Sequence, residues 1–271
     1  MAMSVFTLPH ADFTGQGLPT LFPFVERADL EFSYDFRARA DRLECIDGDR
    51  AALVPYRNDI VAGVYEVDPS IILPASSGDG IRIELGCLLT DYECPTIPID
   101  GSMQFSVLVV GGFSGVEFPA DKISGSTPSN VNFLDFGSGG GPNSVILNDH
   151  SNGDVGARID AAAINVGSEK SSLAQKVFMI LTFDGSNWTV HNKTLGTIVT
   201  RSNAELGITE ALEPLTTQST TLAIGHYSAA NTSQAKFPDM YQLAMWRRVL
   251  NDSEITAQYV LSKAAQPNLD L

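Results

Sequence analysis

The sequence predicts an all-β protein that folds as an antiparallel sandwich of the jelly-roll type. From about residue 41 onward, apolar and polar residues alternate with a period of two, most clearly over residues 81–89 and 103–110. Such alternation is typical of strands with one buried face. The segments between the strands are rich in Gly, Asn, Asp and Ser, which reverse the chain at little cost. Many short strands joined by regular turns indicate an antiparallel sandwich.

The order of the expected elements follows from these patterns. The expected strands are residues 81–89, 103–110, 132–136, 144–147, 157–160, 176–183, 188–192, 197–200, 221–225 and 240–247. One short helix should close the fold at its C-terminal end. Asn251 is a capping residue with Glu254 three positions on, and Ile255 and Tyr259 lie one turn apart, so that both should face inward. Pro267 stops any further helix.

Residues 1–40 differ from the rest, because Pro and Gly interrupt them too often for one helix or one central strand. They predict an extended docking arm, which leaves residues 41–271 as the jelly-roll domain. The aromatic residues of this arm need burial, either against the body of the same chain or against a neighbouring subunit. The predicted assembly residues are Phe6, Phe13, Phe22 and Phe24.

Composition excludes several classes of protein. The 17 Lys and Arg against 32 Asp and Glu give a net charge of −15, while 44% of the residues are hydrophobic, enough for a sizeable core. Nucleic acid and anionic membrane surfaces are not expected partners, since no run of three basic residues occurs. The apolar runs fall short of a membrane span, and no secretory signal peptide is expected at the N-terminus. Cys45, Cys87 and Cys94 form an odd set that predicts free thiols.

Neither a catalytic set nor a metal site is expected. Glu26, Asp29 and Glu31 have the residue types of a glycoside hydrolase, but their spacing places the first two on opposite faces of a strand. Arg27 is expected to form a surface ion pair there instead. The four histidines lack a metal-ligand spacing, and no Asp-x-Asp pair marks a Ca²⁺ site, so no cofactor is predicted.

The best candidate for ligand binding is the loop at residues 148–154, which gathers carboxylate, amide, imidazole and hydroxyl groups at the end of a strand. Sugars are bound by such polar groups beside an aromatic ring. The candidate carbohydrate-binding residues are Asp149, His150, Asn152, Asp154, Trp188 and Tyr227. Two alternatives stay open: the loop is a solvated turn, and Trp188 packs in the core. Asp184 is expected to shape its own hairpin.

The order of features in the second half of the chain resembles a known family. Residues 176–185, then 188–196, then 222–225, then Phe237 followed by 241–255 are similar to the C-terminal half of a concanavalin A-like jelly roll of the laminin-G or pentraxin type. The resemblance covers residues 100–262. The chain departs from the family at Pro238-Asp239, where Gly is common, and at Gln242, where an acidic residue is common.

Domains that resemble this one recur on bacteriophage particles, in tail fibres, spikes and head decorations. The resemblance therefore implies a non-enzymatic structural or adhesion protein of a virion, assembled in the host cytoplasm with other virion subunits and with copies of itself. Its loops would contact host surface glycan, with avidity supplied by repeated copies. The alternative is a carbohydrate-binding lectin module of a cellular protein. A glycoside hydrolase, the third hypothesis, would need two carboxylates that face each other across a groove.

Overall fold

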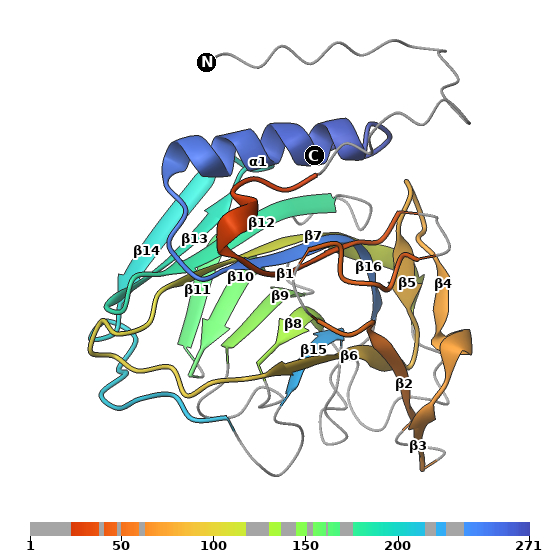
Figure 1. The fold of residues 1–271 in the computed structure, drawn as a ribbon, viewed down its shortest axis with the longest axis horizontal. Helices are drawn as coiled ribbons and strands as arrows, with labels where there is room; N and C mark the ends of the chain where they lie inside the picture. Colours follow the sequence, from red (N-terminus) through yellow and green to blue (C-terminus); the bar gives the residue numbers. More distant parts are fainter. Residues whose placement is uncertain are drawn as a thin grey trace.

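The protein is a sandwich of two antiparallel β-sheets with one α-helix across the outer face of the first sheet (Figure 1). The computed structural model describes residues 23–37, 41–47, 50–59, 63–117, 130–136, 145–150, 154–160, 162–168, 176–214, 221–225 and 236–271. The predicted fold class, an all-β sandwich with a C-terminal helix, is confirmed. Within the described residues, no helix is both long enough and apolar enough to cross a membrane.

The first sheet has eight strands. Its order is β14 (Thr197–Ser202), β13 (Asn187–Asn192), β12 (Lys176–Phe183), β7 (Phe105–Glu117), β16 (Lys236–Trp246), β5 (Ile81–Ile83) and β4 (Ile72–Pro74), with β1 (Leu30–Asp35) also paired to β16. Strand β16 therefore lies at the centre of this sheet, where β7, β5 and β1 all pair with it.

The second sheet also has eight strands. Its order is β11 (Ala162–Ser168), β10 (Asp154–Ile159), β9 (Val145–His150), β8 (Asn130–Asp135), β15 (Thr221–Gly225), β6 (Gly86–Glu93), β2 (Val54–Asp59) and β3 (Val64–Val67). Two short 3₁₀ helices, η1 (Arg27–Asp29) and η2 (Pro69–Ile71), precede β1 and β4. Strands β1, β2, β3, β4 and β11 were not among the expected elements.

The central strands β7 and β12 of the first sheet are covered on both faces by other parts of the chain. All eight residues of β12 are buried. Toward the second sheet, Phe183 stacks on Trp188 with ring centroids 4.1 Å apart, and Phe105 meets the same indole edge-on at 5.9 Å. Toward the outside, Phe178 meets Tyr259 of the helix at 5.2 Å. This second layer explains why β7 and β12 show continuous hydrophobic runs.

Helix α1 (Asp252–Ala265) begins as the sequence predicts. The Asn251 side chain accepts hydrogen bonds from the backbone N–H groups of Ser253 and Glu254, and the Glu254 carboxylate accepts from the Asn251 N–H, which completes a capping box. Ile255 is fully buried, and Tyr259 packs on the first sheet. The helix ends at Ala265, before Pro267.

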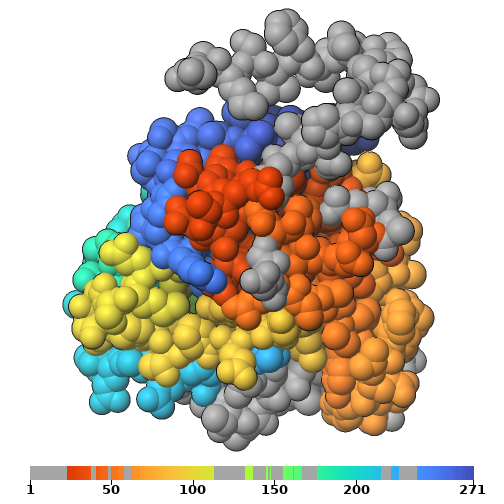
Figure 2. Space-filling model, viewed as in Figure 1, coloured from red at the N-terminus to blue at the C-terminus, as the bar shows by residue number. Residues whose placement is uncertain are grey.

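Strand β1 lies within the predicted arm, yet it is a core strand. All six of its residues are buried, and it pairs with β16 along its length. Just before it, Phe24 is only 3% exposed and belongs to the layer beneath helix α1. In Figure 2, residues 23–37, in red, pack directly against the C-terminal segment, in blue. Residues 23–35 therefore belong to the sandwich rather than to the arm, and Phe24 is buried against its own chain. Phe6, Phe13 and Phe22 lie outside the described residues.

The strand expected at residues 81–89 is two strands in different sheets. Leu85 adopts a left-handed backbone conformation, with φ of 54°, and this turn carries the chain from β5 of the first sheet to β6 of the second. A Cβ atom built at Gly86 would lie 2.2 Å from the carbonyl oxygen of Tyr56, so only glycine fits where β2 and β6 approach each other. Alternation continues through this break, and the pattern alone therefore cannot reveal it.

Candidate functional site

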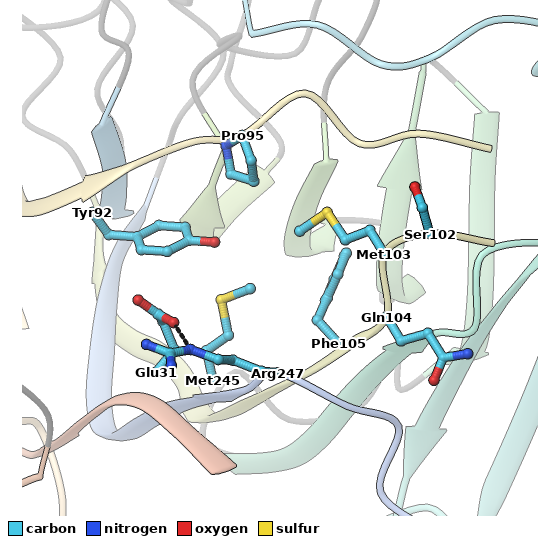
Figure 3. Close-up of a pocket in the computed structure, with 9 residues that line it drawn as sticks. All are labelled: Glu31, Tyr92, Pro95, Ser102, Met103, Gln104, Phe105, Met245 and Arg247. Atoms are coloured by element: carbon cyan, nitrogen blue, oxygen red, sulfur yellow. Dashed lines mark hydrogen bonds and ion pairs between the residues drawn. The ribbon is translucent and has the colours of Figure 1, made fainter. Parts of the chain in front are cut away.

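A pocket of about 310 Å³ opens at one end of the sandwich, where β6 and β16 end and β1 and β7 begin (Figure 3). Because neighbouring strands run antiparallel, these four ends meet at the same place. The pocket is lined by Glu31, Tyr92, Pro95, Ser102, Met103, Gln104, Phe105, Met245 and Arg247. A volume of this size is at the lower end of the range, roughly 300 to 1,000 Å³, that small-molecule sites occupy.

The floor of the pocket is apolar and is continuous with the core. Phe105 is fully buried, and its ring lies 5.7 Å from that of Phe183. Met245 is 2% exposed, while Met103 is half-buried and packs against the same core. These side chains are held by dense packing, so the floor keeps its shape without a ligand.

The rim carries the charge. The Glu31 carboxylate accepts hydrogen bonds from the guanidinium groups of Arg50 and Arg247. Arg50 also lies over the Tyr92 ring, 5.0 Å from its centroid, which is close enough for a cation–π contact. Burial works to raise the pKa of Glu31, but the hydrogen bonds from Arg247 and Arg50 outweigh it, so this pKa lies below its ordinary value. Glu31 is therefore an ionised, occupied acceptor at neutral pH.

Two rim groups remain available to a ligand. The Arg247 side chain is 69% exposed although one of its nitrogens is bonded to Glu31, so its other N–H donors face solvent. The Tyr92 hydroxyl points into the pocket (Figure 3). Burial, together with the Glu31 carboxylate, raises the pKa of Tyr92 to about 12, and its hydroxyl therefore stays protonated and able to donate. Of the described residues that line the pocket, Glu31 is the one carboxylate, so they supply no acid–base pair.

None of the carbohydrate-binding residues predicted from the sequence is among the described residues that line this pocket. Asp149 and His150 belong to strand β9 and Asp154 begins β10. These two strands pair antiparallel in the second sheet, with Asp149 opposite Val155. Asn152 and Tyr227 lie outside the described residues. Trp188 is fully buried in the core and donates its indole N–H to Asn203 Oδ1 at 2.8 Å. Its ring is therefore not exposed to a sugar, and core packing is its role in this structure.

Most pocket residues were missed by the sequence argument. Glu31 was considered, as a member of the rejected catalytic set, and the remaining residues carried no local signal. The pocket residues come from three regions that are far apart in the chain, at residue 31, residues 92–105 and residues 245–247, and none forms a spaced motif. The exposed guanidinium of Arg247, directly after an apolar strand, is the one feature that draws attention in retrospect.

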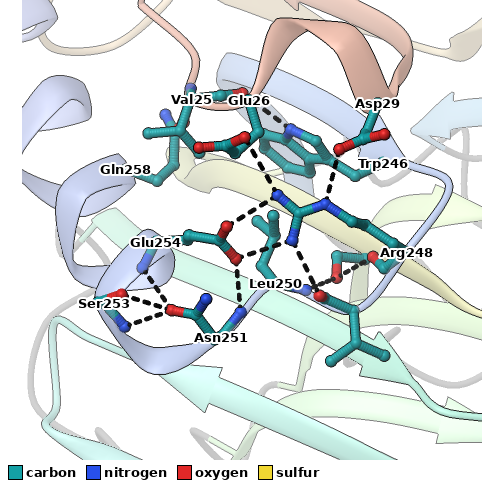
Figure 4. Close-up of polar contacts among 12 residues, drawn as sticks. Val25, Glu26, Asp29, Trp246, Arg248, Leu250, Asn251, Ser253, Glu254 and Gln258 are labelled. Atoms are coloured by element: carbon teal, nitrogen blue, oxygen red, sulfur yellow. Dashed lines mark hydrogen bonds and ion pairs between the residues drawn. The ribbon is translucent and has the colours of Figure 1, made fainter.

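The other two acids of the rejected catalytic set hold the fold together (Figure 4). Arg248 binds Asp29 at 2.7 Å, Glu26 at 3.4 Å and Glu254 at 2.8 Å, which ties η1 to the start of helix α1. These interactions raise the pKa of Arg248, mainly through its hydrogen bonds to Glu254 and Asp29. Arg27 forms the expected surface ion pair, with Asp47 at 2.7 Å.

Other polar groups named from the sequence have structural positions. Asp184 accepts hydrogen bonds from the backbone N–H groups of Ser186 and Asn187 and so shapes its hairpin, as predicted. Cys45, Cys87 and Cys94 are free thiols, and burial raises the pKa of each. Within the described part of the chain, no group of three His, Cys, Asp or Glu side chains is placed to hold a metal ion.

No protein-family model matches this sequence, and no curated protein matches it either. Among solved structures, the binding domain of Paraclostridial Mosquitocidal Protein 1 is 11% identical, with a TM-score of 0.51 over 87% of this chain and 52% of that one. Botulinum neurotoxin type C, whose cell entry depends on interaction with two ganglioside molecules, is 13% identical, with a TM-score of 0.48 over 89% and 52%. Trypanosoma rangeli sialidase is 16% identical, with a TM-score of 0.48 over 88% and 33%.

The chain thus spans about half the length of the toxin structures and a third of the sialidase. At this identity the likeness to the mosquitocidal protein's binding domain concerns the fold alone. It agrees with the two-sheet β-sandwich described above. The ligand must be argued from the pocket.

Proposed function

We propose that this chain is a non-enzymatic glycan-binding module that uses the pocket between β1, β6, β7 and β16. One observation carries the proposal: a small pocket combines an apolar, fixed floor with an Arg–Glu–Tyr rim. A sugar ring has one apolar face of C–H groups and an edge of hydroxyl groups. The floor of Phe105, Met103 and Met245 suits the face, while Arg247, Tyr92 and Gln104 suit the hydroxyl edge.

The charges of the rim favour a neutral sugar. Glu31 stands opposite any anionic ligand that would approach Arg247, and it already neutralises that guanidinium. A neutral diol can bind without disturbing this ion pair, because its oxygens accept from the remaining N–H donors of Arg247 and from the Tyr92 hydroxyl. A pocket of this size holds one ring, and binding at a single site should therefore be weak, with avidity supplied by several copies.

The test is a titration of the full-length chain with a panel of neutral and acidic mono- and oligosaccharides, followed by NMR or calorimetry. We expect a neutral sugar to bind, and Arg247→Ala to weaken that binding at least tenfold. Arg201→Ala, an exposed arginine of β14 outside the pocket, is the matched control and should bind normally. Loss of binding in Asp149→Ala with normal binding in Arg247→Ala would move the site to the β9–β10 hairpin.

We also propose that this module is one of several identical subunits on a phage particle. Its support is an exposed apolar edge of the second sheet, formed by Val54, Tyr65 and Val67, which are 41%, 48% and 61% exposed. Strand β3 is the last strand of its sheet, and such edges invite pairing with another chain. Analytical ultracentrifugation should show an oligomer of the full-length chain. A monomer at all concentrations would contradict this part and leave glycan binding intact.

The absence of enzymatic activity belongs to the same proposal. Glu31 is held by two arginines, and Glu26 and Asp29 by Arg248, so all three acids already act in ion pairs. Prolonged incubation with each bound oligosaccharide should leave it uncut. Release of shorter sugars, abolished by Glu31→Gln, would instead support a glycoside hydrolase.

A further inference from the structure

A lysine and an aspartate meet in the buried layer outside the first sheet, away from the pocket. Lys176 begins β12 and Asp239 lies near the start of β16, with β7 between these strands. Gly112 of β7 is the registered partner of both residues. Because glycine has no side chain, the lysine crosses over β7 without obstruction and reaches the carboxylate on the far side.

The two groups are in contact and shielded from water. Lys176 Nζ lies 2.8 Å from Asp239 Oδ2, and the two side chains are 2% and 0% exposed. The backbone N–H of Ser76 donates to the same oxygen at 3.0 Å, and the Ser76 hydroxyl also bonds to it. Tyr241 is fully buried beside them, with its ring centroid 5.8 Å from Nζ. The second oxygen, Asp239 Oδ1, has no hydrogen-bond partner among the described residues.

Burial works against the charged form of Lys176. Burial lowers the pKa of Lys176 below its ordinary value, although the attraction of Asp239 opposes the shift. Asp239 Oδ2 accepts hydrogen bonds from Ser76 and Lys176, whereas Oδ1 has no partner among the described residues, so the buried pair is only half satisfied. Transfer of one proton from Nζ to Oδ2 produces a neutral amine beside a carboxylic acid. These are the two reactants of amide formation.

We propose that Lys176 and Asp239 join in an intramolecular amide bond between strands β12 and β16. The neutral Nζ attacks Cγ of the protonated Asp239 and forms the C–N bond. The C–Oδ2 bond then breaks, and Oδ2 takes a second proton from Nζ and leaves as water. Oδ1 becomes the amide carbonyl oxygen, and no oxidant or other reagent takes part. Ser76 binds the departing oxygen through its N–H and hydroxyl groups.

The fold supplies what this reaction lacks in open solution. The strands hold nucleophile and electrophile in contact, which replaces a bimolecular encounter by an intramolecular step. Ser76, in the loop between β4 and β5, donates a hydrogen bond to the Asp239 carboxylate. Gln266, just after helix α1, donates to the carbonyl of Asp79 in the same loop and so helps to hold the loop in place. Burial on this side excludes water, and this protects the product from hydrolysis. The inference does not depend on glycan binding.

Intact-mass spectrometry of the purified full-length chain tests the proposal directly. We expect a mass lower than the sequence mass by one water molecule. Tryptic digestion should then fail to cut after Lys176 and should release a branched peptide that joins residues 171–193 to residues 237–247. A folded protein with the full sequence mass and normal cleavage after Lys176 would overturn the proposal.

Lys176→Met is the control variant, because it removes the amine and keeps a side chain of similar length. Its mass should equal its own sequence mass. A loss of water that persists in this variant would assign the dehydration to another site and would also overturn the proposal. On a denaturing gel, the wild-type chain should migrate faster than the variant, because the internal link keeps the unfolded chain more compact.

Discussion

Two pairs of oppositely charged side chains lie near the two ends of strand β16, and they differ in how far they are exposed to solvent. Near its start, Asp239 meets Lys176 with both side chains nearly or fully buried. Directly after its end, Arg247 meets Glu31 at the pocket rim, where the arginine side chain is 69% exposed. Water screens the charges of the rim pair, and the exposed part of its guanidinium can contact a ligand. The buried pair is shielded from water and interacts only with other parts of its own chain.

The largest expected effect concerns the buried pair. Asp239→Ala leaves the Lys176 amine buried without its carboxylate and also removes the acid needed for the proposed amide bond. Removal of one partner from a buried pair alone costs about 3–5 kcal/mol, so the loss should be at least this large. Urea unfolding should show this loss in the free energy of unfolding. Asp79→Ala, an exposed acid of the neighbouring loop, is the control and should change little. Equal free energies of unfolding for the two variants would show that the buried Lys176–Asp239 pair does not stabilise the fold.

The network around Arg248 is intermediate between the two pairs, since its side chain is 29% exposed. Arg248→Ala removes charge-assisted hydrogen bonds to Asp29 and Glu254 and separates η1 from the start of helix α1. We expect a loss of about 2 kcal/mol in the free energy of unfolding. Hydrogen exchange should increase at the start of helix α1. If Arg201→Ala is equally destabilising, the network is not the cause.

The rim pair should reveal itself in the dependence of stability on pH. The pKa of Glu31 lies below its ordinary value of 4.5 in the folded state, so its stabilisation is complete above that value and is lost as the pH falls through the lower, folded pKa. Glu31→Gln should cost about 1.5 kcal/mol at neutral pH. Below pH 4.5 the unfolding free energies of the variant and the wild type should converge. A constant difference across the acid range would contradict this assignment.

The smallest effect on stability belongs to Arg247 itself. Arg247→Ala removes an exposed partner, and exposed ion pairs contribute at most about 1 kcal/mol. Thermal unfolding should therefore be nearly unchanged while sugar binding is lost. A large loss of stability would show that this arginine supports the fold rather than the pocket.

Local features were predictable from the sequence, and long-range ones were not. The capping box at Asn251 and the hairpin at Asp184 depend on neighbours within three residues, and both were predicted. Strand β1 was missed although its apolar and polar residues alternate, because it follows a Pro-rich segment and was assigned with that segment to the arm. The turn at Leu85 was missed because alternation continues through it.

The pocket and the buried pair were missed for a different reason. Glu31 and Arg247 are adjacent only because β1 pairs with β16, and Lys176 reaches Asp239 only because Gly112 lies between them. Such proximity depends on strand order and register, which no segment of the sequence encodes alone. The role of Asp149, His150 and Asp154 in carbohydrate binding was inferred from local polarity, and it remains a prediction.

The pairing of β1 with β16 also determines when β1 can acquire its partner strand during synthesis. Roughly 200 residues separate these strands, and at about 5–20 residues per second a ribosome needs on the order of 10–40 seconds to deliver the second after the first. Throughout that interval β1 lacks its partner strand, and among the described residues synthesised before β16 its backbone pairs with the chain only at the bridge between Ser33 and Asp47. The nascent chain therefore depends on β16 to protect β1, and any chaperone that shields residues 30–35 acts before the sandwich can close.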